Sequence, residues 1–353
     1  MKSVWKQPYF IIGFAIFCFF LVGSFVYEWI YGPEPAQTFF IYDEQGVLLE
    51  AAPLSPSLKH PLGTDQHGYE MLSKIMIGAK FTILSAMGVA AVRMLLAIPL
   101  GYAIGTYWQK RRSLINSFID PLHYIPMTIF SYLMLFPILW EPMGGFTTTV
   151  WERIMLQVVL MGVITVPIVA ALIGNEANLL YHNEFILASR TLGASRFRII
   201  RKHLYPLMRE KLFVLYGQQV VETLVVFAHL GLLQLFIGGT KVSYEPMFGD
   251  PPKSIAYEWA GLFGNSFRYL QGVPWLPLAP AICFGLLILA IACMIEGYTR
   301  AANGLVKLPK RKNKLMVSEQ TVDWNKQQLK EKLELLTQKE QDKLVRSKQK
   351  VSE

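Results

Sequence analysis

Two ionisable residues stand inside long apolar stretches of this sequence, where a charge is costly. Arg93 lies near the middle of the stretch 81–109, and Glu222 is the eleventh residue of the stretch 212–240. An unpaired charge at the centre of a membrane-spanning helix costs about 2.5–3.5 kcal/mol even on the most lenient scale. Each side chain must therefore face water or a partner. The two residues either line a path for a polar solute or pair with each other and hold two helices in register.

No other group of residues forms a recognisable catalytic or metal-binding motif. The sequence has no GxxxxGKS/T phosphate loop, since the run 238–241 lacks the spacing, and it has no HExxH, CxxC or nucleophile-elbow motif. The three cysteines, Cys18, Cys283 and Cys293, all lie in apolar runs and are expected to be small buried residues. We therefore expect no enzyme activity, no cofactor bound by this chain and no metal site.

Charged residues are unevenly distributed along the chain. Of its 353 residues 53% are hydrophobic and 17% are charged, against the roughly 25% charged residues of soluble domains. The segment 307–353 holds thirteen Lys or Arg and seven Asp or Glu, which is two-thirds of the net charge of +9. This segregation excludes a disordered chain, a coiled coil and a disulfide scaffold. It favours a polytopic membrane protein with a basic tail.

Six apolar stretches are long enough to cross a hydrocarbon core, which takes about 20 helical residues. They are 7–27, 81–109, 121–140, 154–175, 212–240 and 269–295. The first stretch could be a cleaved signal peptide, but no small-x-small cleavage site follows it, so we expect a retained anchor. The sequence therefore predicts an all-α polytopic membrane protein with six transmembrane helices.

The distribution of Lys and Arg predicts the orientation of these helices. With the N-terminus inside, 26 of the 34 basic residues fall on the cytoplasmic side, as do both termini. Two of the loops outside the cell membrane are then substantial. The first contains two β-prone runs around 43–46 and predicts a small extracellular hairpin in which Gly46 supplies a positive φ. It either docks a partner or merely connects two helices. The last, 241–268, is rich in Pro and Gly, and we expect it to be irregular.

These features divide the chain into parts. They are the cytoplasmic N-terminus with the first anchor (1–30), the extracellular loop (31–75), a five-helix core (76–300) with a cytoplasmic loop (176–211), and a basic cytoplasmic tail (301–353). In the tail, Leu329, Leu333 and Leu336 have the spacing of an amphipathic helix, and the basic cluster 310–314 could bind anionic membrane lipid. A solvated extension is the alternative.

The cytoplasmic loop is predicted to form two short helices. Gly193 interrupts a helix-forming stretch that starts at Glu184, and Pro206 is expected to end its second part. Amphipathic helices held against the membrane would present a knob to a soluble partner. The basic residues of the second part, among them Arg196 and Arg198, serve that surface or simply snorkel at the membrane interface.

This loop resembles the ATPase-coupling loop of ABC-importer permeases. Their pattern is Glu-Ala-Ala, then Gly four residues after the second Ala, then Pro thirteen residues after the Gly. The residues assigned to the coupling loop, including the Leu-Gly-Ala-Ser run and the His of the peptide-importer variety, are Ala188, Ser189, Leu192, Gly193, Ala194, His203 and Pro206. Two positions depart from the pattern, since Leu187 replaces its Glu and Ser189 its second Ala.

Other motifs extend the resemblance to about 53–298. The run 60–68, His-Pro-Leu-Gly-Thr-Asp-Gln-His-Gly, is similar to the opening of the core in the C-type permease subunit of oligopeptide, dipeptide and nickel ABC importers. Asp120 with Pro126, the run 259–261 and the prolines of 274–280 follow in the family's order. The chain is thus identified as a member of this permease family.

The resemblance implies a type I importer permease that forms half of a translocation path. Its partners would be a second homologous permease subunit, two ABC ATPase subunits that hold ATP and Mg, and an extracellular substrate-binding protein, with no nucleic acid. The substrate implied is an oligopeptide or a dipeptide, and nickel is the alternative. Leu187, Ser189 and the long tail also allow a transport-impaired relative that acts as a membrane binding or regulatory subunit.

Overall fold

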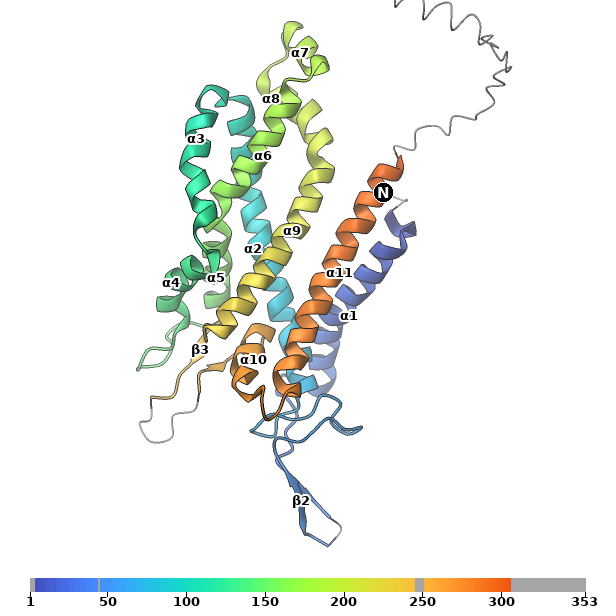
Figure 1. Ribbon diagram of the computed structural model, residues 1–353, viewed down its shortest axis with the longest axis vertical. Helices are drawn as coiled ribbons and strands as arrows, with labels where there is room; N and C mark the ends of the chain where they lie inside the picture. The colour runs from blue at the N-terminus through green and yellow to red at the C-terminus, as the bar shows by residue number, and fades with distance from the viewer. Residues whose placement is uncertain (1–3, 44, 245–250, 306–353) are drawn as a thin grey trace, which may run out of the picture. The chain divides into compact units, whose positions relative to one another are not determined.

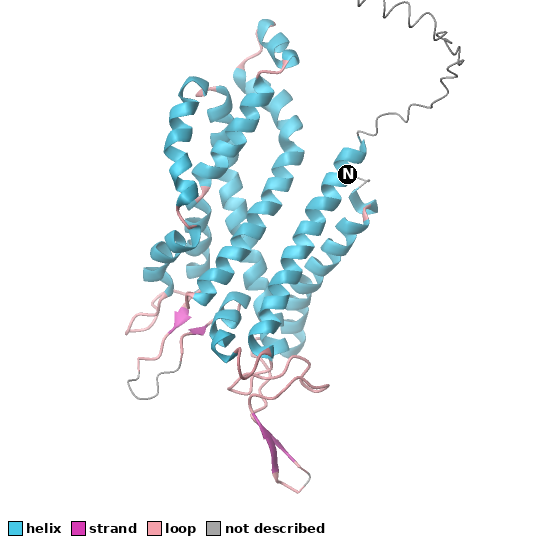
Figure 2. Ribbon diagram, in the orientation of Figure 1, coloured by secondary structure: helices cyan, strands magenta, loops and turns pink. Residues whose placement is uncertain are grey.

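Long apolar helices make up most of the structure (Figures 1 and 2). The computed structural model describes residues 4–43, 45–244 and 251–305. Residues up to Gly304 belong to one compact unit. The predicted amphipathic and basic segments of the tail lie outside the described residues. The longer helices are α1 (Pro8–Tyr31), α2 (Met71–Thr106), α4 (Met127–Leu139), α5 (Val150–Ile164), α6 (Val166–Tyr181), α9 (Tyr205–Leu232) and α11 (Trp275–Leu305).

Shorter elements connect these helices. The short α-helices are α3 (Arg112–Ile119), α7 (Glu184–Thr191), α8 (Arg196–Ile199) and α10 (Trp259–Ser266). A π-helical turn, η4, covers Ile200–Leu204, and 3₁₀ turns cover Val4–Lys6 (η1), Gln109–Arg111 (η2), Asp120–Tyr124 (η3) and Phe267–Tyr269 (η5). The strands are β1 (Phe40–Tyr42), β2 (Leu48–Ala51), β3 (Thr240–Lys241) and β4 (Lys253–Ser254).

The described residues confirm a polytopic all-α membrane protein. Four helical segments are long and apolar enough to cross a membrane, and the number rises to six if each of two bent helix pairs is one span. One pair bends by 81° between η3 and α4, and the other by 45° between α5 and α6. The predicted span 121–140 is not one continuous helix, because Pro126 holds Ile125 in an extended conformation and α4 starts only after it.

Paired charges move several helix ends away from their predicted positions. α2 begins at Met71 instead of 81 and includes Lys74 and Lys80, which form ion pairs with Asp65 and Glu28. The predicted limit between the outer loop and the core, at 75, therefore falls inside α2. In the same way α6 runs to residue 181 and α9 starts at residue 205, so helical residues occupy both ends of the predicted loop 176–211.

One end of the helical unit carries a hairpin, and we call it the hairpin end (Figure 1). β1 and β2 pair in antiparallel fashion. At their turn the Gly46 N–H donates to the Asp43 carbonyl at 2.9 Å, and Gly46 has a φ of 77°. α7 lies at the opposite end, which we call the α7 end.

The segment 241–268 was expected to be irregular, and this expectation is wrong for its described part. β3 and β4 pair there, and α10 packs beside α2 and α9. Trp259, the first residue of α10, is fully buried, and its indole Nε1–H donates to the Ile75 carbonyl at 2.9 Å. The sequence does not predict this helix because it is short and five of its eight residues are Gly, Ala, Ser or Asn, which leaves little apolar periodicity.

Glycines allow α10 to approach α9 with backbone contact. A Cβ added to Gly264 would lie 1.9 Å from the Gly231 carbonyl oxygen, and one added to Gly231 would lie 2.2 Å from the Ala260 carbonyl oxygen. Neither position can hold a larger residue without moving one helix backbone.

The carboxylate of Glu258 holds the start of α10. Its Oε2 accepts from the Ala260 N–H and its Oε1 from the Gly261 N–H, both at 2.7 Å, and Oε1 also accepts from the Ile237 N–H at 3.3 Å. The side chain is fully buried. Burial raises the pKa of Glu258 to about 7, although the backbone hydrogen bonds oppose this shift.

Gly264→Ala tests the contact between α9 and α10. A methyl group should gain up to about 1 kcal/mol of helix propensity, but the overlap with Gly231 should cost about 1–3 kcal/mol or more, so we expect a lower thermal midpoint in detergent. Gly285→Ala in α11 is the matched control, because a Cβ added there would meet no neighbouring atom within 4 Å, and it should be neutral or stabilising. Equal midpoints for the two variants would contradict the close contact.

Glu258 should make stability depend on pH. Its pKa is about 7 in the folded protein and near 4.5 in the unfolded chain, so the folded state binds more protons between these values. The contribution of protonated Glu258 to the free energy of unfolding is fully present below about pH 4.5 and is lost as the pH rises to about 7. We expect the thermal midpoint to fall over this window, and Glu258→Gln to flatten the slope. The exposed Glu50→Gln serves as control and should keep the slope of the unmodified protein.

Candidate functional site

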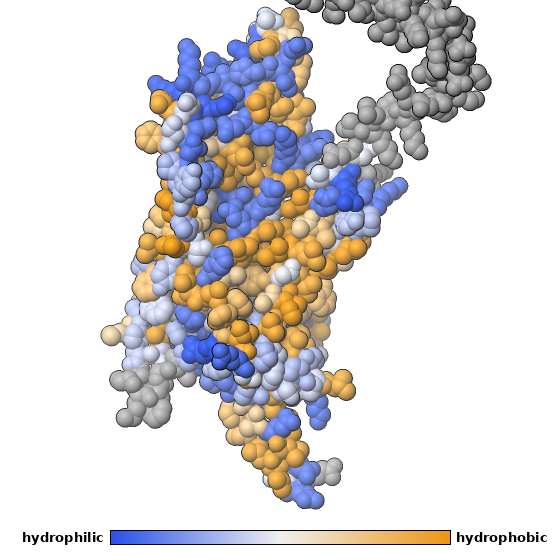
Figure 3. Space-filling model, viewed as in Figure 1, coloured by the Kyte–Doolittle hydropathy of each residue, from blue (hydrophilic) through white to orange (hydrophobic). Residues whose placement is uncertain are grey.

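The α7 end carries the residues that the sequence assigns to the coupling loop. We call residues 182–204, which contain α7, α8 and η4, the coupling segment. Figure 1 shows α7 at the tip of this end, beyond α6 and α9. Hydrophilic side chains gather over this end, and apolar side chains cover much of the visible face below it (Figure 3).

Gly193 makes the turn between α7 and α8. It has a φ of 84°, a left-handed conformation that Gly adopts without strain, and its N–H donates to the Arg190 carbonyl at 2.9 Å. The Ala194 N–H donates to the Ser189 carbonyl at 3.1 Å, and the hydroxyl of Ser195 accepts from the Arg198 N–H at 3.4 Å. The Leu-Gly-Ala-Ser run therefore ends one helix and starts the next.

Buried aliphatic side chains fix the coupling segment to the helical unit. Ile186, Ile199 and Leu204 are fully buried and belong to an apolar cluster with residues of α2, α6 and α9. The expectation that Pro206 ends a helix is wrong. Residues Arg196–Leu232 form one continuous helical span, and Pro206 lies in the first turn of α9, directly after the π turn η4.

The opposite side of the coupling segment is exposed and partly apolar. Leu192 is 89% exposed, and Phe185, Leu187 and Phe197 are exposed as well. Of the residues that carry the resemblance, Ala188, Leu192, Gly193 and Pro206 are exposed, and Ser189, Ala194 and His203 are half-buried. Leu187, at the pattern's Glu position, thus belongs to the exposed surface.

Two arginines of the coupling segment contact aromatic rings of the helical unit. The guanidinium of Arg190 lies 4.8 Å from the ring centre of Tyr181, and that of Arg196 lies 5.3 Å from the ring centre of Tyr107. Contacts of this kind contribute about 0.5–1 kcal/mol each at exposed sites. They add to the buried aliphatic residues in holding α7 and α8 to the bundle.

A second candidate site lies in the middle of the helices. Arg93 of α2 and Glu222 of α9 are brought together, with 3.6 Å between Nη1 and Oε2. The Arg93 Nη1–H also donates to Gln219 Oε1 at 2.5 Å, and Nη2–H to the Met161 carbonyl at 3.5 Å. We call these four residues the polar cluster, which joins α2, α5 and α9.

The two charges of the polar cluster differ in their surroundings. The Arg93 side chain is 4% exposed, whereas the Glu222 side chain is 47% exposed. A buried guanidinium needs its anion, while a half-exposed carboxylate can be reached by a solute. The arrangement can therefore both hold three helices together and present a negative group at the surface of this subunit.

Several polar residues of the structure could not be predicted as functional from the sequence. Gln219 carried no signal because it is uncharged and stands among other polar residues of α9. Lys74 and Lys80 were visible as charges, but they indicated the end of a helix because the sequence does not show which anions they meet. Within residues 4–43, 45–244 and 251–305, no three His, Cys, Asp or Glu residues are grouped so that they could hold a metal ion.

Residues 97–296, more than half of the chain, match the family described as binding-protein-dependent transport system inner membrane component. The chain is also similar to the glutathione transport system permease proteins GsiD of Escherichia coli O1:K1 and of Shigella boydii serotype 4. Identity is 24% over 294 residues in both cases, which cover 83% of this chain and 86% of each relative.

Glu222→Gln tests the ion pair of the polar cluster. Because it leaves the buried Arg93 without an anion, we expect the free energy of unfolding in detergent to fall by about 1–3 kcal/mol. The double variant Arg93→Met with Glu222→Gln should regain most of this loss, because no uncompensated charge remains.

A surface ion pair provides the control for this measurement. Lys211 and Glu176 lie 2.6 Å apart with both side chains exposed, so Glu176→Gln should change the free energy of unfolding by less than about 1 kcal/mol. If Glu222→Gln has no larger effect than Glu176→Gln, the polar cluster does not hold the helices together.

Proposed function

The chain belongs to the family of binding-protein-dependent transport system inner membrane components and is a permease subunit of an ABC importer, and from this premise we propose that it carries short peptides. The proposed substrates are oligopeptides, dipeptides or small peptides of the glutathione kind. The sequence motifs of the peptide importers support the first two, and the similarity to the glutathione permeases supports the third.

The proposed assembly follows from the two ends of the helical unit. In it, the coupling segment faces the cytoplasm and contacts a separate ABC ATPase subunit, which binds ATP and Mg. A second, homologous permease completes the path and engages a second ATPase. An extracellular substrate-binding protein delivers the peptide at the hairpin end, and both termini lie in the cytoplasm.

The observation that carries this proposal is the two-sided character of the coupling segment. Buried residues such as Ile186 anchor it, while Phe185, Leu192 and Phe197 are exposed at its surface. Exposed apolar side chains of this size are typical of protein-protein contacts. A rigid, apolar projection at the end of a long helical span suits a contact through which ATP-driven motion reaches the membrane helices.

The polar cluster has a place in the same proposal. Arg93 holds α2, α5 and α9 in register, and the half-exposed Glu222 faces the translocation path. Motion of α9 would then move a negative charge that a passing substrate meets. Transport would be impaired by neutralising Glu222 even in a variant whose stability is restored.

Gly193→Val tests the contact with the ATPase. A β-branched residue at a φ of 84° is strained by about 1–3 kcal/mol, so the turn between α7 and α8 should open. We expect at least tenfold less ATPase subunit to co-purify with the permease, and a matching loss of peptide uptake by cells carrying the whole importer.

Two further variants make the result specific. Gly193→Asn should retain most of the co-purification, because Asn tolerates the left-handed conformation. Gly272→Val, at the hairpin end, meets no atom within 4 Å and should leave the contact intact. If no ATPase subunit co-purifies with the unmodified chain, the proposed assembly is wrong.

A further inference from the structure

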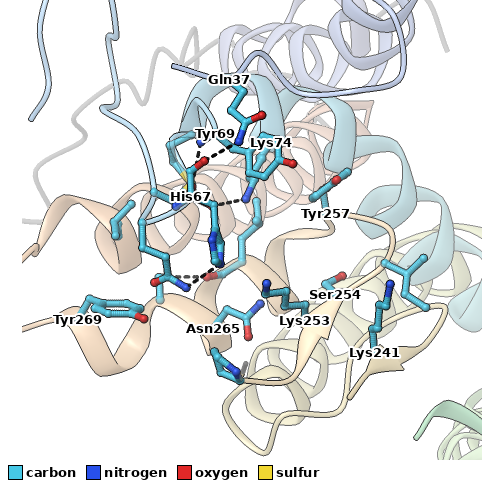
Figure 4. Close-up of a pocket in the computed structure, with 18 residues that line it drawn as sticks. Gln37, His67, Tyr69, Lys74, Lys241, Lys253, Ser254, Tyr257, Asn265 and Tyr269 are labelled. Carbon is cyan, nitrogen blue, oxygen red and sulfur yellow. Dashed lines mark hydrogen bonds and ion pairs between the residues drawn. The ribbon is translucent and has the colours of Figure 1, made fainter. Parts of the chain in front are cut away.

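A pocket of about 560 Å³ lies at the hairpin end, away from both sites described above. Its volume is in the range of about 300–1,000 Å³ that is usual for small-molecule sites. The loop before α2, the start of α2, the strands β3 and β4, and the segment from α10 to the start of α11 form its walls (Figure 4). Elements far apart in the sequence thus converge on one cavity.

Basic side chains dominate the charge of this pocket. Lys74, Lys241 and Lys253 line it, and Asp65 is the one acidic residue among the lining residues. Asp65 is already occupied, because its Oδ1 accepts from the backbone N–H groups of His67 and Tyr69 at 2.9 Å and its Oδ2 pairs with Lys74. It has little capacity left for a cationic ligand.

Lys241 is the basic group best placed for a ligand. It is exposed at the end of β3, and in the described part of the chain no ion pair of Lys241 is found. Lys253 lies opposite it in the β3–β4 ladder. A carboxylate at the end of β3 would receive charge-assisted hydrogen bonds from Lys241.

The remaining walls suit a ligand that is more than a simple anion. Asn265 Oδ1 is buried and has no hydrogen-bond partner among the described residues, so it can accept from an amide N–H. Met71, Leu262 and Leu276, all almost fully buried, contribute apolar atoms to the lining of the pocket. A free carboxylate, an amide N–H and an apolar side chain are the features of a short peptide at its C-terminus.

We propose that this pocket binds the C-terminal carboxylate of the transported peptide within the permease itself. The inference rests on the proposed function and adds to it a substrate class, peptides with a free C-terminus, and a site of recognition in the membrane subunit. A peptide released at the hairpin end would be held there by its carboxylate before it enters the path between the helices.

Binding of defined probes to the purified full-length permease in nanodiscs tests the proposal. We expect tri-alanine to bind in the absence of any binding protein, and tri-alanine amide, which lacks the carboxylate, to bind at least tenfold more weakly. Lys241→Gln should weaken tri-alanine binding about tenfold and leave the amide unchanged. Lys241→Arg should retain most of the affinity, because it keeps the charge.

Lys59→Gln is the matched control, because Lys59 is exposed in the same loop region but does not line the pocket. It should bind tri-alanine like the unmodified chain. Equal affinity for tri-alanine and its amide would overturn the proposal, as would a Lys241→Gln variant that binds tri-alanine normally.

The carboxylate could instead belong to an acidic side chain of the substrate-binding protein. If Lys241→Gln weakens capture of that protein by the complex but not tri-alanine binding, the peptide site is refuted.

Uptake assays separate this proposal from the function on which it rests. A complex that imports tri-alanine through a permease without affinity for it refutes the pocket alone. A complex that imports no peptide, although the permease distinguishes tri-alanine from its amide, refutes the import function and leaves the carboxylate site.

Discussion

A charge buried among membrane helices must be compensated, and in this protein α2 carries three such cations. Each finds its anion on a different element: Lys74 on the loop before α2 at Asp65, Lys80 on α1 at Glu28, and Arg93 on α9 at Glu222. Removing an anion leaves a buried cation without compensation, so each pair restrains a neighbour of α2. The same helix packs against α5, α6 and α10. α2 is therefore the element around which the others are placed, and its cations hold the preceding loop, α1 and α9 beside it.

The second constraint is the continuity of one helical span. Residues Arg196–Leu232 run without a break from the coupling segment to the hairpin end. Near its last turn, Gly231 contacts the backbone of α10, and the polar cluster ties its middle to α2. α10 in turn forms part of the wall of the pocket at the hairpin end. A stiff element thus joins the surface proposed for the ATPase to the pocket proposed for the substrate, with side-chain contacts to α2 on the way.

The sequence was sufficient for the fold class and the family, and insufficient for the ends of the helices. The lengths of the apolar stretches are enough to identify the spans. The turn of the coupling segment could be predicted at Gly193 because a left-handed conformation depends on the local sequence and not on tertiary contacts. Because of Lys74 and Lys80, the start of α2 was predicted about ten residues too late. A charge pattern does not reveal which anion each lysine will meet in the fold. The pocket could not be predicted for the same reason: Asp65, Lys241 and Asn265 come together only through tertiary contacts between the first loop, the β3–β4 pair and α10.

The two proposed contact points for a substrate have opposite charge, and their order along the helices has a physical consequence. A peptide with free termini carries a carboxylate, which the lysines at the hairpin end attract, and an ammonium group, which the half-exposed Glu222 attracts deeper among the helices. Neither contact is fully desolvated, since Lys241 is exposed and Glu222 is 47% exposed, so each binds weakly enough to release. Weak, successive sites favour passage over retention. The ion pair with Arg93 serves both roles, because it compensates the deeply buried guanidinium and holds the Glu222 side chain in place on α9.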